Sequence, residues 1–255
     1  MGSASTALQA LEMIAAHQPL GVSELARQLG ISKPSGQRAI QSLATDNWIR
    51  RSEEHPGRWV LTPKVLDVAA HVGQESGLRE IAFPLMTELA GTTTETVHLA
   101  IRDDTDIVII EEVESTQVVR IHWPVGRRSP IYASANGKAI LAALPRDTMN
   151  DHLPIRLTAF TSETITDRRR LTAELDRTAQ RGYAVQRGEL RSDVAAIAAA
   201  ITSKSDSPVG AVGIFMPIQR LREEDEERLG HLVRTTADTI AAKLATRVSR
   251  RSAGM

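Results

Sequence analysis

The chain of 255 residues contains no cysteine and few aromatic side chains, and both absences narrow what the protein can be. Without cysteine it cannot form disulfides, iron–sulfur clusters or thiolate metal sites. Phe, Trp and Tyr make up only 3% of the residues, so few rings are there to stack on exposed bases. This scarcity argues against a reader of single-stranded RNA, and it means that Ala, Leu, Ile and Val must build the core.

Net charge and long apolar runs are also absent. The formal net charge is zero, but residues 1–64 carry seven basic against five acidic side chains, so the N-terminal part is slightly basic. No apolar run approaches the ~20 residues that span a bilayer, and the N-terminus lacks a signal-peptide pattern. We therefore expect a cytoplasmic protein that does not bind a membrane. At about 100–200 residues per domain, the length predicts two domains.

Three segments near the N-terminus show the apolar spacing of short helices: residues 5–16, 22–29 and 32–43. Ser23 and Ser32 are suited to cap the second and third helices. Gly30 lies between them, where a helix often ends in a left-handed residue, and Pro34 falls in the first turn, where a missing N–H costs little. This arrangement predicts a helix-turn-helix.

A hairpin is expected directly after the third helix. Residues 48–51 and 59–61 have strand character, and His55-Pro56-Gly57 between them is typical of a turn. A hairpin in this place is a wing, so residues 1–62 are predicted to form a winged helix.

The third helix is predicted to expose polar side chains that suit DNA. The major groove is about 12 Å wide and admits one helix. Arg, Gln and Ser can pair with base edges, a lysine near the helix start suits a phosphate, and wing arginines would meet the backbone or minor groove. The candidate DNA-binding residues are Lys33, Ser35, Gln37, Arg38, Gln41, Arg50, Arg51 and Arg58. The alternative is a solvated polar helix on a winged helix that binds protein.

This region resembles the DNA-binding domain of IclR-type bacterial transcriptional regulators. The resemblance rests on Gly21-Val22-Ser23-Glu24-Leu25-Ala26, Gly30-Ile31-Ser32-Lys33, Ala39-Ile40-Gln41-Ser42-Leu43 and the hairpin. The chain departs from the family pattern at residues 34–37, so we expect an operator other than the family's commonest one. Gly36 costs ~1 kcal/mol inside a helix, which predicts a less regular third helix.

A connecting helix is predicted over residues 63–78. Thr62 is a suitable N-cap, Pro63 suits the first turn, and Leu66, Ala69 and Ala70 would be buried. The resemblance implies that this helix joins two domains and helps to pair two subunits.

The second domain is predicted over residues 79–248, with a basic tail at 249–255. Strands are expected at 95–101, 107–113, 118–122, 183–185, 194–201 and 209–216, and helices at 79–90, 136–144, 166–181 and 222–247. Hairpins with helices between them predict a mixed sheet covered by helices. The fold class is therefore a two-domain α+β protein.

The IclR resemblance continues through this domain. It rests on the segments at 95–100, 125–130, 133–139 and 181–185. It implies a GAF-like domain that binds a small-molecule effector and contributes to homodimers, which can pair into dimers of dimers. A symmetric dimer would read a near-palindromic operator on double-stranded DNA.

A loop feeding a helix N-terminus, residues 134–138, is the candidate effector site. Free N–H groups at such a place favour a carboxylate. With the family's pocket positions, the implied effector-binding residues are Ser134, Ala135, Asn136, Gln186, Val194, Ala196, Gly213 and Phe215. Members that bind small polar acids tend to carry polar side chains at positions that are largely apolar here. We therefore expect a larger, more apolar effector such as an aromatic acid, with Ile121, Trp123 and Met216 either lining the cavity or simply packing in the core.

The hypotheses of an enzyme, a metal site or a cofactor site have less support than that of a ligand-responsive regulator. Gly137-Lys138 is not a phosphate loop, because Tyr132 and Ala139 stand where Gly and Ser or Thr are needed. His98 and His122 lie on neighbouring strand candidates and could form a metal pair, but structural histidines are favoured. Glu111, Glu112 and Glu114 fit a strand end. We expect no cofactor and no metal, and three classes stay open: a ligand-responsive transcription factor, an enzyme with a regulatory winged helix, and a protein-binding adaptor.

Overall fold

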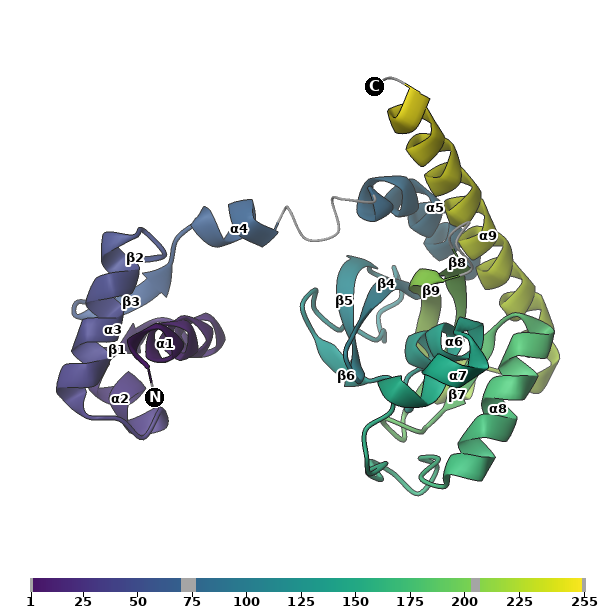
Figure 1. Cartoon of the computed structure of the whole chain (residues 1–255), viewed down its shortest axis with the longest axis horizontal. Helices are drawn as coiled ribbons and strands as arrows, with labels where there is room; N and C mark the ends of the chain where they lie inside the picture. The colour runs from purple at the N-terminus through teal and green to yellow at the C-terminus, as the bar shows by residue number, and fades with distance from the viewer. Residues whose placement is uncertain (1, 70–76, 203–206, 254–255) are drawn as a thin grey trace. The chain divides into compact units, whose positions relative to one another are not determined.

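The computed structural model describes residues 2–69, 77–202 and 207–253, with side chains as far as Arg247. The chain divides into two compact units, Met1–Val72 and Gly73–Met255, called here the N-terminal and C-terminal units (Figure 1). Among the described residues, no helix is both long enough and apolar enough to cross a membrane.

The N-terminal unit is a winged helix-turn-helix, as predicted. Its elements are α1 (Ser3–His17), β1 (Leu20–Gly21), α2 (Val22–Gln28), α3 (Lys33–Thr45), β2 (Ile49–Arg51) and β3 (Arg58–Leu61). The strands form an antiparallel sheet in the order β1-β3-β2. The hairpin of β2 and β3 is the predicted wing, whereas β1, on the other side of β3, was not predicted. The core joins α1, α2, α3 and the sheet through Ile14, Leu25, Ile40 and Ile49.

The turn between α2 and α3 follows the expected capping chemistry at one helix and departs from it at the other. Gly30 is left-handed, with φ of 65°. The Ser32 hydroxyl accepts a hydrogen bond from the Ser35 N–H at 3.3 Å, so it caps α3. Ser23 does not cap α2, because that helix already begins at Val22 and leaves Ser23 in its first turn.

The predicted irregularity at Gly36 is wrong. Helix α3 runs unbroken from Lys33 to Thr45, and Gly36 is buried against α2. A Cβ placed on Gly36 would meet the Ala26 Cβ at 3.4 Å, so the two helices are already in close contact there. Packing of this kind overrides a weak helix propensity.

Helix α4 (Lys64–Ala69) continues from the wing, and its burial was predicted wrongly. The Thr62 hydroxyl accepts from the Lys64 N–H at 3.3 Å, as expected of a cap. Within this chain, however, no side chain of α4 is buried, and Leu66 is 70% exposed. The rest of the predicted helix, with Ala70, lies at 70–76, outside the described residues.

The C-terminal unit is built on a six-stranded sheet in the order β6-β5-β4-β9-β8-β7. The strands are β4 (Thr96–Asp103), β5 (Asp106–Val113), β6 (Arg128–Pro130), β7 (Ala184–Arg187), β8 (Val194–Thr202) and β9 (Pro208–Pro217). Every pairing between them is antiparallel, so the expectation of a mixed sheet is wrong. The hairpins β4–β5, β7–β8 and β8–β9 pair antiparallel by construction, and β4 and β9 join the two sets of strands in the same antiparallel sense.

Residues 118–122, where a strand is predicted, form no strand. They lie in the connection between β5 and β6. Val118 is 94% exposed, so its β-branched side chain has no sheet face to pack against. The short edge strand β6 takes the place beside β5, pairing Ile107 with Ser129.

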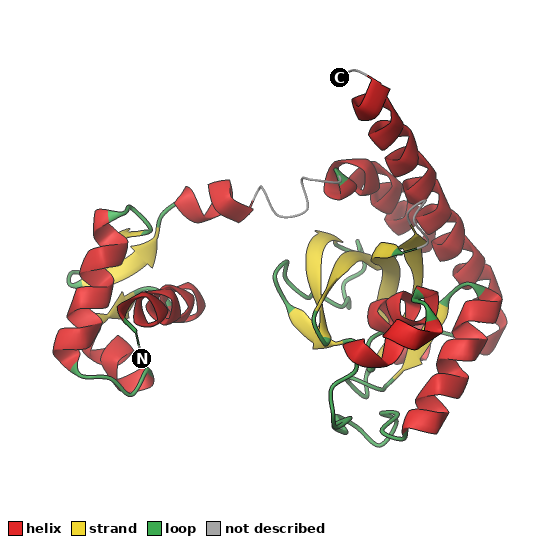
Figure 2. Ribbon diagram, in the orientation of Figure 1, coloured by secondary structure: helices red, strands yellow, loops and turns green. Residues whose placement is uncertain are grey.

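Helices cover both faces of the sheet (Figure 2). One face packs against α5 (Leu78–Thr93) and α9 (Glu223–Ala253), and the other against α6 (Ala135–Ala143) and α8 (Arg168–Arg181). Shorter helical turns are α7 (Arg146–Met149), η1 (Asn150–His152) and η2 (Ile218–Arg220). The sheet therefore separates two apolar cores, and only the core beneath α6 and α8 contains the predicted effector positions on β8 and β9.

Candidate functional site

Helix α3 presents a polar face to solvent and an apolar face to the core. Lys33, Gln37, Arg38 and Gln41 are exposed, while Ala39, Ile40 and Leu43 are buried. The predicted base-reading side chains of this helix therefore lie on one accessible surface, apart from Ser35.

Ser35 is half-buried and its hydroxyl is already engaged. It lies 2.9 Å from the Ser32 hydroxyl and accepts a hydrogen bond from Nη2 of Arg38 at 3.0 Å. This contact holds the Arg38 guanidinium against the first turn of α3. Ser35 thus positions the Arg38 guanidinium through this hydrogen bond. A direct contact between Ser35 and DNA stays a prediction.

The three wing arginines are exposed, and each contacts another group of the N-terminal unit. Arg50 donates to Glu53 at 3.1 Å, and the Arg51 guanidinium lies 5.0 Å from the centroid of the Trp59 ring. Arg58 donates to the carbonyl oxygen of Pro19 at 2.8 Å and to Glu24 at 3.2 Å. Exposed pairs of this kind contribute little to stability, so phosphates can compete for these cations.

The N-terminus of α6 is buried and tightly packed. The Ser134 hydroxyl accepts from the Gly137 N–H at 3.0 Å, which satisfies one of the free donors that could otherwise hold an anion. Ala135 and Asn136 are fully buried. A Cβ at Gly137 would collide with the carbonyl oxygen of Ile131, so only glycine allows this approach.

Asn136 carries an unsatisfied buried amide. Within the described part of the chain, neither its Oδ1 nor its Nδ2 has a hydrogen-bond partner. A Cβ on Gly213 would lie 2.6 Å from this Oδ1, so the glycine on β9 makes room for the amide. A buried polar group without a partner costs about 1–3 kcal/mol, which marks Asn136 as a place where a ligand would be stabilised.

An aromatic cluster lies on the same sheet face: His98 on β4, Phe215 on β9 and Trp123 in the β5–β6 connection. The centroids of the His98 and Phe215 rings are 4.5 Å apart, and those of Trp123 and Phe215 are 5.4 Å apart. Burial lowers the pKa of His98, although its hydrogen bond with Glu112 opposes this shift. The Trp123 indole N–H has no acceptor among the described residues, which leaves a second polar atom for a ligand.

Arg127 places a cation beside this aromatic cluster. Its guanidinium lies 4.5 Å from the centroid of the Trp123 ring, and its Nε is buried. No carboxylate of the described residues pairs with Arg127. Burial, followed by the charge of Arg191, lowers the pKa of the Arg127 guanidinium. In the sequence Arg127 stands out only as part of the motif at 125–130, and the pattern does not show that it lacks an acidic partner.

The remaining predicted effector residues fall into two groups. Val194, Ala196 and Phe215 face the core beneath α6 and α8, together with Ile121 and Trp123. The Gln186 side chain closes the β7–β8 hairpin: with its amide assigned in the orientation that satisfies its hydrogen bonds, its oxygen accepts from the Glu189 N–H at 2.7 Å and its nitrogen donates to the Val194 carbonyl oxygen at 3.3 Å. Met216 packs in the opposite core, against α5 and α9, so it does not line this site.

A buried ion pair under α6 also escaped the sequence analysis. Lys138 is fully buried, and its Nζ donates to Glu189 and, at 2.7 Å, to the carbonyl oxygen of Val185. Burial raises the pKa of Glu189, while the charge of Lys138 opposes the rise. The pair ties α6 to β7 and to the hairpin after it.

An exposed recognition helix on a winged helix, joined in one chain to a domain with unsatisfied buried polar groups, defines a ligand-responsive DNA-binding protein. The family model described as Bacterial transcriptional regulator IclR C-terminal matches residues 70–242, and a MarR family model matches residues 4–58. The chain belongs to the IclR family of bacterial transcriptional regulators. The family comprises regulators rather than enzymes, which removes the enzyme alternative.

Similar proteins cover nearly the whole chain. The HTH-type transcriptional regulator KipR of Bacillus subtilis is 33% identical over 230 residues, 89% of this chain and 91% of KipR. The Transcriptional repressor IclR of Escherichia coli is 28% identical over 235 residues, 91% of this chain and 85% of that protein. The crystal structure of an IclR homolog complexed with 4-hydroxybenzoate from Microbacterium hydrocarbonoxydans has a TM-score of 0.84 at 20% identity, covering 96% of this chain and 100% of that one, and shows the same fold.

Proposed function

We propose that this protein represses a catabolic operon by binding a near-palindromic operator as a homodimer or a dimer of dimers, and that an aromatic acid is its effector. The observation that carries the proposal is the exposed polar face of α3, where Gln37, Arg38 and Gln41 are suited to base edges and Lys33 to a phosphate. The similarity to a repressor in Escherichia coli supports repression rather than activation.

Dimerisation is supported by the apolar side chains that α4 leaves uncovered. Leu66 and Val68 are 70% and 52% exposed within a single chain. Burying apolar surface of this kind against a second copy is favourable, and a symmetric pair of winged helices matches a symmetric operator.

We infer the class of effector from Asn136 and from the aromatic cluster on the same face of the sheet. Arg127 is a cation without a carboxylate partner in the described chain, and Trp123 and Phe215 beside it suit an aromatic ring. Val194 and Ala196 offer an apolar wall, and the Asn136 amide is suited to a polar substituent. A carboxylate on a ring would pair with Arg127. The 4-hydroxybenzoate bound by the Microbacterium protein is a compound of this class.

The effector can change DNA affinity only if it prefers one spacing of the two winged helices over another. We assign the transmission to the segment from Pro63 onward, which leads from β3 into the C-terminal unit.

The DNA-binding step is tested by titrating the protein against its own upstream region at several salt concentrations. We expect affinity to fall linearly on a log–log plot as salt rises, because phosphate neutralisation releases counterions. Arg38→Ala should weaken binding by about 1–3 kcal/mol and relax base preference at one position. Arg222→Ala, an exposed arginine of the C-terminal unit, is the matched control and should bind as the wild type does. Wild-type affinity for Arg38→Ala would refute its assignment as a base reader.

The effector class is tested by calorimetry with benzoate, 4-hydroxybenzoate and a small polar acid such as pyruvate. Arg127→Gln should weaken the aromatic acids by more than about 10-fold, the scale of a lost charge-assisted hydrogen bond. Arg128→Gln is the control, since Arg128 is exposed and paired with Asp103 and Asp106. If only the small polar acid bound, the aromatic class would be wrong while the regulator assignment would stand.

A further inference from the structure

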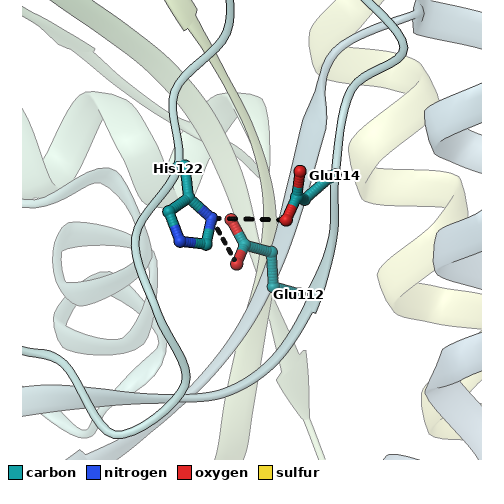
Figure 3. Close-up of side chains that lie close together, drawn as sticks. All are labelled: Glu112, Glu114 and His122. Carbon is teal, nitrogen blue, oxygen red and sulfur yellow. Dashed lines mark ion pairs between the residues drawn. The ribbon is translucent and has the colours of Figure 1, made fainter.

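Two carboxylates and an imidazole converge where β5 ends, outside the groups assigned to DNA or effector (Figure 3). His122 Nδ1 lies 3.2 Å from an oxygen of Glu112 and 3.5 Å from an oxygen of Glu114. Their ligand-type atoms all lie within 4.8 Å of one another. Glu112 and Glu114 flank Val113 at the end of the strand, and His122 comes from the connection that returns past it.

These separations fit a shared metal ion. In a tetrahedral site with bonds of about 2.0–2.2 Å, neighbouring ligand atoms lie roughly 3.3–3.6 Å apart. The two distances from His122 are close to this range, so small side-chain movements would complete three ligands. Imidazole with carboxylate is a ligand set that suits zinc and similar transition metals.

The second oxygen of each carboxylate is held by another group, which turns the remaining oxygen towards His122. Glu112 Oε1 accepts from the backbone N–H of Trp123 at 3.2 Å and lies 3.1 Å from Nε2 of the fully buried His98. Glu114 Oε2 accepts from Arg120 at 3.1 Å. Outer contacts that orient ligating carboxylates are a regular feature of metal sites, and His98 provides one from inside the core.

We propose that Glu112, Glu114 and His122 bind a divalent transition metal ion such as Zn²⁺, through Oε2, Oε1 and Nδ1 respectively, with a water completing the coordination. The ion offsets the charge of two neighbouring carboxylates. It also fastens the β5–β6 connection, which carries Trp123 and Arg127, to the end of β5. The site does not depend on the identity of the effector.

The test is calorimetric titration of the full chain, freed of metal with a chelator, with ZnCl₂ and separately with MgCl₂. We expect one high-affinity Zn²⁺ site, much weaker Mg²⁺ binding, and a Zn²⁺-dependent rise in the unfolding midpoint, since a ligand that binds the folded state stabilises it. Glu114→Gln and His122→Gln should each weaken Zn²⁺ by more than about 10-fold. Both side chains are about half exposed, so these variants should fold.

His231→Gln is the matched control, because His231 forms an exposed pair with Glu227 at 3.7 Å without a third ligand. It should bind Zn²⁺ as the wild type does. Absence of Zn²⁺ binding in the wild type, or equal affinity in the wild type, Glu114→Gln and His122→Gln, would overturn the proposal. In that event, the three groups form ion pairs only.

Discussion

The two units of this regulator use polar residues in opposite ways. In the N-terminal unit, the proposed functional side chains are exposed and lie close together in sequence on α3 and the wing. In the C-terminal unit, they are mostly buried and come from α6, β8, β9 and the β5–β6 connection. Among the described residues, every buried side-chain polar atom without a partner belongs to the C-terminal unit.

In the N-terminal unit, the residues proposed to bind contribute little to the stability of the fold. In the C-terminal unit, the residues proposed to bind also contribute to stability. Substituting an exposed arginine of α3 changes what the surface attracts and leaves the fold intact, because exposed charges contribute little to stability. Substituting a group beneath α6 alters the buried core, where one polar atom without a partner costs about 1–3 kcal/mol. Stability measurements are therefore informative about the C-terminal unit, and binding measurements about the N-terminal unit.

The largest effect is expected for Lys138→Met. The change leaves Glu189 as a buried charge without its partner, which should cost about 3–5 kcal/mol. Hydrogen exchange resolved by peptide measures this, because it reports each unit separately. Protection should fall across β7 and β8 while α3 keeps its wild-type protection.

The double variant Lys138→Met with Glu189→Leu is the control for the buried pair. Replacing both charges by apolar groups should recover most of the loss, since buried ion pairs are often matched by apolar packing. If the double variant were as unstable as the single one, the bond from Lys138 to the Val185 carbonyl oxygen would be the more important contact.

Glycine substitutions sharpen the comparison at an intermediate scale. A Cβ on Gly213 would lie 2.6 Å from Asn136 Oδ1 and 2.9 Å from the Ile197 carbonyl oxygen, so Gly213→Ala should cost about 1–3 kcal/mol. The matched change in the N-terminal unit, Gly36→Ala, meets the Ala26 Cβ at 3.4 Å and the Val22 carbonyl oxygen at 3.7 Å, which are ordinary van der Waals contacts, and should gain up to about 1 kcal/mol of helix propensity. Urea unfolding of both variants measures the sign of each change in the free energy of unfolding. Destabilisation by Gly36→Ala would show that α2 and α3 cannot move apart to accommodate the added methyl group.

The same contrast explains what could be predicted from the sequence. The start of helix α3 at Ser32, its apolar stripe and its polar face are local patterns and were predicted correctly, whereas the packing of Gly36 against α2, which keeps the helix regular, is not local. The pairing of Lys138 with Glu189 joins residues 51 positions apart, and no local pattern relates them. The strand predicted at 118–122 failed for a similar reason, since alternation alone could not reveal that β6 would pair with β5 instead.

The candidate site shows the same division. Asn136, Gly213 and Phe215 entered through family resemblance, and only coordinates could tell that Asn136 is unsatisfied and that Gly213 makes room for it. Of the two roles predicted for Met216, the structure shows the core one, because adjacent residues of a strand face opposite cores and its neighbour Phe215 faces α6 and α8.

The smallest effects are expected at two serine caps that share one chemical role in different surroundings. Ser32 caps α3 at the surface at 3.3 Å, and Ser134 caps the buried α6 at 3.0 Å. Removing a cap costs about 0.5–2 kcal/mol. We expect Ser32→Ala near the lower end, because water can replace the hydroxyl, and Ser134→Ala near the upper end, because the Gly137 N–H would be left without an acceptor. Both costs are measured by urea unfolding, with Thr at each position as the variant that keeps a hydroxyl. Equal costs at the two caps would mean that water reaches the start of α6. The contrast between exposed polar groups in the N-terminal unit and buried ones in the C-terminal unit would then not hold for the helix caps.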